Sequence, residues 1–137
     1  MRVLYCFFLL MLPFATLRAE SLAGNCSCHS DPEITSRQYR LKGFDPELNE
    51  TYTGTVTITK EGKFYTAFWA FDDGEVNIGK GLRKNNVLSF TYIDTANPPG
   101  VIGLQVYEIE NDFHELKGPW ITIGGTLVGT ESLHEIH

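Results

Sequence analysis

The sequence between residues 37 and 133 consists of short segments rich in β-branched and aromatic residues, separated by Gly, Asn, Asp and Pro. These turn residues recur at steps of roughly 8–12 residues, which is the spacing of an antiparallel meander. No segment keeps apolar residues at i, i+3, i+4 and i+7 over three turns, as an amphipathic helix would. We therefore expect eight strands, at residues 37–43, 53–60, 63–71, 75–82, 87–93, 101–109, 114–123 and 126–133.

Eight antiparallel strands joined by tight turns can close on themselves, and closure removes the open edges at which sheets aggregate. The interior of an eight-stranded barrel is filled by side chains or holds one small ligand. The expected fold class is therefore all-β, a single eight-stranded antiparallel up-and-down barrel of the calycin-like kind, formed by residues 37–137.

Residues 1–19 have the layout of a cleaved secretory signal peptide: Arg2, an apolar run over 3–17, and the small Ala19 before Glu20. The run is shorter than the about 20 apolar residues of a membrane span. Residues 20–36 are polar and without periodicity, so we expect a flexible N-terminal segment there. The expected location is secreted or periplasmic, without a membrane span.

The charge of the chain excludes some classes of partner. Its net charge is −6, and all 17 acidic residues lie at or after Glu20, whereas Arg2 and Arg18 would be lost with the signal peptide. Lys and Arg are dispersed along the chain among the acids, whereas nucleic-acid binding needs a basic face that neutralises phosphates. We therefore exclude nucleic acids and anionic membranes as partners.

Cys26 and Cys28 would remain after signal cleavage, in an oxidising compartment. A disulfide, either local or between chains, is the first interpretation. Soft thiolates also favour Cu(I) or Zn, and His29 follows directly, although this group lacks the usual spacing and a fourth ligand. Lipid attachment at Cys26 is the third interpretation.

Alternation of side chains along each segment predicts which of them point into the barrel. Glu131 shares a strand face with Leu133, and Lys80 shares one with Ile78. We therefore expect Lys80 and Glu131 to form an internal charge pair, in which loss of one partner costs about 3–5 kcal/mol. The full set of expected inward residues in the middle segments is Val56, Ile58, Val76, Ile78, Lys80, Leu82, Leu88, Phe90 and Tyr92.

The segment 63–71 is apolar on both faces. One face is therefore expected to fill the barrel, and the other to be covered by another part of the chain or by a partner. Tyr and Trp are frequent anchors of protein interfaces. Trp69 is the first candidate for a partner contact, and Trp120 is expected to plug the core. The candidate residues for binding a partner or a ligand are Tyr65, Trp69, Phe71, Tyr92, Tyr107 and Trp120.

The chemistry-bearing residues do not form a catalytic pattern. No serine lies in a Gly-x-Ser-x-Gly elbow, and the histidines at 114, 134 and 137 fall in a turn or near the end of the sequence. The pairs at 72–73 and 108/110 are typical of turn-capping and solvated carboxylates. We expect no enzyme activity, no metal site and no cofactor.

Turn glycines and core aromatics recur in short motifs along the domain. They are Tyr52-Thr53-Gly54-Thr55-Val56-Thr57-Ile58, Gly62-Lys63-Phe64-Tyr65, Gly79-Lys80-Gly81-Leu82, Tyr107-Glu108-Ile109, Leu116-Lys117-Gly118-Pro119-Trp120 and Gly129-Thr130-Glu131. This set resembles a group of small exported bacterial β-barrel proteins, of lipocalin- and avidin-like architecture, some of which are labelled fibronectin-binding proteins. The resemblance implies a secreted, non-enzymatic barrel that binds a host or extracellular protein.

The leading functional expectation is a binding protein that contacts an extracellular protein through the barrel surface. One alternative is a carrier of a small apolar ligand, which needs an interior cavity of about 300 Å³ or more. The many aromatic residues favour a filled interior instead. A second alternative is an inhibitor of a periplasmic or secreted enzyme, which would present the rigid loop at residues 97–100.

Overall fold

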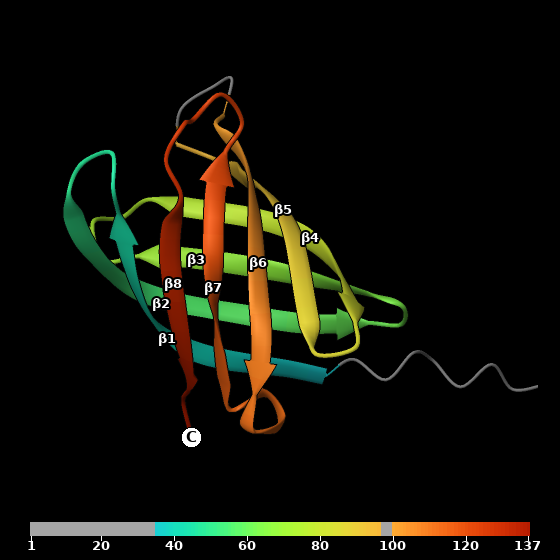
Figure 1. Ribbon diagram of the computed structural model, residues 1–137. Coiled ribbons are helices and arrows are strands. Elements are labelled where there is room, and N and C mark those ends of the chain that lie inside the picture. The colour runs from blue at the N-terminus through green and yellow to red at the C-terminus, as the bar shows by residue number, and fades with distance from the viewer. Residues whose placement is uncertain (1–34, 97–99) are drawn as a thin grey trace, which may run out of the picture.

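The computed structural model describes residues 35–96 and 100–137, which form a closed barrel (Figure 1). Each strand pairs antiparallel with the next, and β1 pairs with β8, which confirms the expected fold class. In chain order the elements are β1 (Thr35–Asp45), β2 (Glu50–Glu61), β3 (Phe64–Phe71), β4 (Val76–Lys84), β5 (Val87–Asp94), β6 (Ile102–Glu110), the 3₁₀ turn η1 (Asn111–Phe113), β7 (Glu115–Thr122) and β8 (Gly129–Glu135).

Several expectations fall outside the described residues. They are the signal peptide, nearly all of the N-terminal segment with Cys26 and Cys28, and residues 97–99 of the proposed inhibitory loop. The first strand begins at Thr35, two residues before its expected start. Within residues 35–96 and 100–137, no helix is long and apolar enough to cross a membrane.

The last strand lies further along the chain than expected. β8 begins at Gly129, and the preceding residues Ile123, Leu127 and Val128 are exposed in the β7–β8 connection. Their apolar and β-branched character resembles that of a strand, but they have no place in the core. Composition alone therefore misplaced this boundary.

The core consists of the inward side chains of seven strands, and its fully buried members include Tyr39, Leu41, Phe90 and Tyr107. The expected inward faces of β2 and β5 are confirmed, since Val56, Ile58, Leu88, Phe90 and Tyr92 are all buried. Glu131 on β8 also points inward, as expected, and is only 7% exposed.

The predicted inward face of β4 is wrong. Ile78 and Leu82 are exposed, and the residues that point inward are Asn77, Gly79 and Gly81. Large rings on the neighbouring strands take the space inside: a Cβ on Gly79 would lie 3.0 Å from the Trp69 ring, and one on Gly81 would lie 2.5 Å from the Phe90 ring. Small residues face inward here because the aromatic residues beside them fill the barrel.

The expected charge pair of Lys80 and Glu131 is therefore wrong as well. Lys80 is exposed on the outer face, where its Nζ lies 5.0 Å from the centroid of the Phe64 ring. An apolar ring next to a long cationic side chain on the surface is a common arrangement, because the cation stays in water while it contacts the ring face. Glu131 has other partners, described below.

One end of the barrel is closed by η1, which lies between β6 and β7 at the bottom of Figure 1. The Phe113 ring stacks on the Tyr65 ring at 6.5 Å between centroids. The guanidinium carbons of Arg37 and Arg83 lie 5.6 and 4.8 Å from the centroid of the same ring. Two cations and a stacked tyrosine thus hold Phe113 across this end, although its backbone has a positive φ of 71°.

Candidate ligand-binding cup

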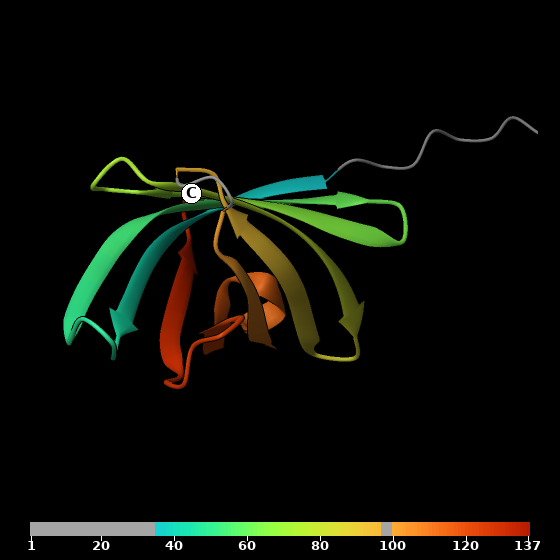
Figure 2. The ribbon, with the colours of Figure 1, turned by 90° about the horizontal axis from the view of Figure 1, so that it is seen from above.

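The opposite end of the barrel opens into a cavity of about 300 Å³. The strands fan around η1 in the view from above (Figure 2). The cavity lies among the connections β1–β2, β3–β4, β5–β6 and β7–β8, which an up-and-down barrel brings to one end. We call this cavity the cup; it is lined by Asp45, Leu48, Glu50, Thr51, Tyr52, Trp69, Phe71, Asp73, Glu75, Asn77, Tyr92, Asp94, Val101, Gln105, Trp120, Thr122 and Glu131.

The Glu131 carboxylate is held in the cup by two phenols from distant strands. Tyr107 on β6 donates its hydroxyl to Oε2 at 2.5 Å, and Tyr52 on β2 donates to Oε1 at 2.8 Å. Trp69 on β3 in turn donates Nε1–H to the Tyr107 hydroxyl at 3.0 Å. A chain of hydrogen bonds therefore runs from β3 through β6 to β8 and fixes the orientation of the carboxylate.

The charge of Glu131 has no cationic partner among the described residues. Burial raises the pKa of Glu131 above its usual 4.5, while the hydrogen bonds from Tyr107 and Tyr52 act in the opposite direction. Burial and the nearby Glu131 charge also raise the pKa of both phenols. These tyrosines therefore stay protonated and remain hydrogen-bond donors.

Aromatic rings form much of the wall of the cup. The Trp69 and Tyr92 rings lie 6.0 Å apart, and the Tyr52 ring makes edge contacts with Phe71 at 5.6 Å and Trp120 at 6.4 Å. Burial, followed by the charge of Glu131, raises the pKa of Tyr92 to about 12. The aromatic part of the wall is thus uncharged.

The Trp120 indole packs against β8. Gly129 is its register partner, and a Cβ there would overlap the indole. Gly118, two residues before the tryptophan, approaches the backbone of β6 instead. The glycine that makes room for the Trp120 indole is therefore Gly129, which lies across the strand pair.

The rim of the cup is acidic. Five carboxylates lie there, in three connections and at the strand ends beside them: Asp45, Glu50, Asp73, Glu75 and Asp94. Burial, together with the charges of Asp73 and Asp94, raises the pKa of Glu75. The lining described above contains no lysine, arginine or histidine.

The structure brings four of the six candidate aromatic residues to the cup: Trp69, Phe71, Tyr92 and Trp120. Tyr107 lies behind Glu131, and Tyr65 lies at the closed end against Phe113. The expectation that Trp69 contacts a partner from the outer face is wrong, because the residue is 2% exposed and hydrogen-bonded inside the barrel. On β3 it is Phe68 that points outward.

Sequence reasoning did not include Tyr52 and Gln105 among the site residues, and it expected an acidic rim without naming the residues that form it. Gln105 is buried and donates its Nε2 to the Pro119 carbonyl at 3.2 Å. A signal for the rim was present, because alternate connections of a meander reach the same end. The first and third connections carry Asp45, Glu50, Asp73 and Glu75.

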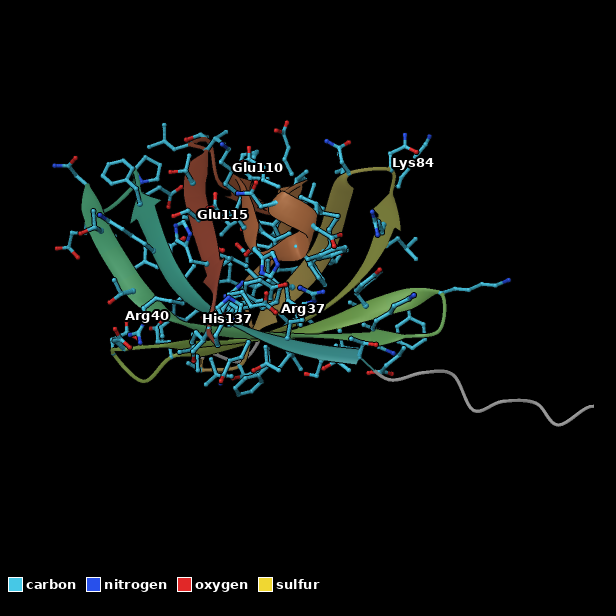
Figure 3. All side chains as sticks on the ribbon, turned by 90° about the horizontal axis from the view of Figure 1, so that it is seen from below. Arg37, Arg40, Lys84, Glu110, Glu115 and His137 are labelled. Carbon is cyan, nitrogen blue, oxygen red and sulfur yellow. The ribbon has the colours of Figure 1, made fainter. Side chains whose placement is uncertain are left out.

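A second polar cluster lies at the closed end, which Figure 3 shows from below with Arg37 and His137 labelled near its centre. His114 Nδ1 lies 2.6 Å from Glu135 Oε2, and His114, Glu135 and His137 offer donor atoms within 4.8 Å of one another. Arg37 donates to both oxygens of the same carboxylate at 3.2 Å. A divalent metal would have to compete with this guanidinium, so the cluster is better suited to an ion-pair network.

Comparison of the sequence with protein-family models and with curated proteins finds no match.

Proposed function

We propose that this chain is a non-enzymatic binding protein that holds a small molecule in the cup. The observation that carries the proposal is the cavity of about 300 Å³, open at one end and walled by aromatic rings around the fixed Glu131 carboxylate. Small-molecule sites are typically concave, largely apolar and provided with a few oriented polar groups, in volumes from about 300 Å³ upward. The alternative of a carrier is therefore favoured over a filled barrel.

The composition of the cup supports binding rather than catalysis. Its described lining contains no serine, cysteine or histidine, so it lacks the usual pairing of a nucleophile with a base. Glu131 is the one buried acid among the described residues, and both of its oxygens already accept hydrogen bonds. The secreted setting of this function remains a prediction from residues 1–19.

Intrinsic fluorescence offers a direct test, because the chain has two tryptophans and both line the cup. A small-molecule library is titrated into the wild type and into Thr122→Phe, which places a ring in the cup. The control is Thr130→Phe, since Thr130 is exposed and does not line the cup. We expect ligands whose binding is lost in Thr122→Phe and kept in Thr130→Phe. Binding that is equal in all three proteins would contradict the proposal.

The expected contact with an extracellular protein is a second candidate, supported by a row of apolar residues on the outer face. Phe68, Ile78, Ile93 and Ile102 are register neighbours on four successive strands. Their side chains are 41–47% exposed. Contiguous exposed apolar surface is typical of protein interaction sites.

The two candidate functions predict opposite effects for substitutions in the outer row and in the cup. If the outer row binds a protein, Phe68→Ser with Ile78→Ser should abolish capture of that protein, for which plasma fibronectin is the first probe because of the family resemblance. Thr122→Phe should leave this capture unchanged. Surface plasmon resonance with the three proteins measures both effects, and unchanged capture by the double variant would eliminate the outer row.

A further inference from the structure

We infer that the cup binds a small organic cation, a protonated amine or quaternary ammonium with an alkyl or aryl body, with Glu131 as its counter-ion. This inference rests on the proposed function and specifies its ligand. It differs from the small apolar ligand that the sequence suggested as one alternative.

The first support is the unpaired charge of Glu131. The residue is 7% exposed, and its two hydrogen bonds come from neutral phenols rather than from a cation. A buried carboxylate without a cationic partner carries a desolvation penalty that hydrogen bonds offset only in part. A ligand cation in the cup would supply the missing partner.

The second support is the aromatic wall. Tyr52, Trp69, Tyr92 and Trp120 line the same cavity as the carboxylate. The faces of such rings attract ammonium groups, most strongly where water is excluded, and rings arranged around one site recognise quaternary ammonium ligands. A ring cluster beside a carboxylate therefore suits a cation better than a neutral apolar molecule.

The third support is the distribution of charge around the barrel. The five acidic rim residues surround the mouth, and no basic residue is among the described residues of the cup. Arg37 and Arg83 instead hold Phe113 at the far end. A cleft lined by one sign of charge concentrates ligands of the opposite sign and accelerates their association.

The lining also argues for an organic cation over a bare metal ion. Leu48, Val101 and the rings occupy positions where a hard cation would need oxygen ligands, of which Ca²⁺ takes about six to eight. An alkyl or aryl body would instead cover these apolar groups. The volume of about 300 Å³ limits the ligand to a small molecule.

Three probes of similar shape and different charge test the inference: phenethylammonium, 2-phenylethanol and 3-phenylpropionate. Each is titrated at neutral pH by calorimetry and by tryptophan fluorescence, with CaCl₂ as a fourth titrant. Phenethylammonium should bind at least about tenfold more tightly than the others, a factor that corresponds to about 1.4 kcal/mol. Its affinity should fall as salt is added, because Glu50, Asp73 and Glu75 of the rim are exposed.

Variants assign the effect to Glu131. Glu131→Gln keeps the shape of the side chain, and it should weaken phenethylammonium binding at least about tenfold while leaving 2-phenylethanol binding unchanged. Asp112→Asn removes one carboxylate from the exposed η1 turn at the opposite end and should change neither affinity. Circular dichroism of each variant confirms that the barrel is folded.

The outcomes separate this inference from the proposed function. Suppose that 2-phenylethanol or 3-phenylpropionate binds as tightly as phenethylammonium, and that Thr122→Phe abolishes this binding. The cup is then a ligand site, but the cation inference is overturned. If no probe shows binding that depends on Thr122, both are overturned. A free amine and the lysine side chain of a protein are two sources of such a cation, and Nα-acetyl-lysine methylamide as a fifth probe distinguishes them. Tighter binding of phenethylammonium supports a free amine as the ligand, and tighter binding of the lysine derivative supports a lysine side chain.

Discussion

The Tyr107 hydroxyl donates a hydrogen bond of 2.5 Å to Glu131, and 24 residues separate the two in the chain. Tyr107 is fully buried, and its hydroxyl also accepts the indole N–H of Trp69. The cup is thus supported from behind by a hydrogen-bonded layer that belongs to the core. A change in that layer should affect both stability and the position of the carboxylate.

Removal of the Tyr107 hydroxyl should therefore destabilise the barrel. In Tyr107→Phe the Trp69 indole loses its acceptor and Glu131 loses one of two donors, so we expect a loss of about 1–3 kcal/mol in the free energy of unfolding. Urea denaturation followed by tryptophan fluorescence measures it. Tyr39→Phe is the matched control, because the buried Tyr39 hydroxyl has no hydrogen-bond partner among the described residues. An equal loss in both variants would contradict the importance of the hydrogen-bond chain.

The stability of the protein should depend on pH through Glu131. Its pKa is raised in the folded state, so the folded protein binds more protons than the unfolded chain between the ordinary 4.5 and the raised value. The contribution of protonated Glu131 to the free energy of unfolding is fully present below pH 4.5, and it is lost as the pH rises through the pKa of the folded state. Glu131→Gln should remove this fall, as measured by urea denaturation across the acid range. A variant with the same pH profile as the wild type would refute the assignment.

The exposed position of Lys80 predicts that its removal is nearly neutral. Lys80→Ala should change the free energy of unfolding by less than about 0.5 kcal/mol, the usual effect of a surface substitution. An internal partner of Glu131 would instead cost about 3–5 kcal/mol. A double-mutant cycle with Glu131→Gln should show additive effects, and a coupling of more than about 1 kcal/mol would restore the internal pair.

The two faces of β3 should respond differently to truncation. Trp69→Ala leaves a cavity beside Phe90 and Tyr92 and should cost about 3–5 kcal/mol. Phe68→Ala removes a ring that is 47% exposed and should cost less than about 1 kcal/mol. Thermal and urea unfolding of the pair checks this. A larger loss for Phe68 would show that the two faces are assigned the wrong way round.

The small inward residues of β4 should not tolerate enlargement. A Cβ on Gly81 would lie 2.5 Å from the Phe90 ring, so Gly81→Ala should cost about 1–3 kcal/mol through overpacking. Leu82→Ala, one residue further on the exposed face, is the control and should be close to neutral. Equal effects on the unfolding midpoint would contradict the inward placement of the glycines.

The number, order and approximate position of the strands followed from the sequence alone. Turn residues and the two-residue period are local properties, and they reappear as the strands from β1 to β8. The inward faces of β2 and β5 could also be predicted, because Val56, Ile58, Leu88, Phe90 and Tyr92 alternate with polar or smaller residues and fill the core. Four of the six candidate aromatic residues were likewise found in the cup.

Only the tertiary structure decided which side chains share the interior. On the inward face of β4, the rings of Trp69 and Phe90 on the neighbouring strands leave no room for a side chain at Gly79 and Gly81. The partners of Glu131 are likewise determined across the barrel, since Tyr52 and Tyr107 reach it from β2 and β6. The alternation of apolar and polar residues along one strand indicates that its two faces differ. Which of the two faces points inward depends on the volume that the neighbouring side chains leave free inside the closed barrel.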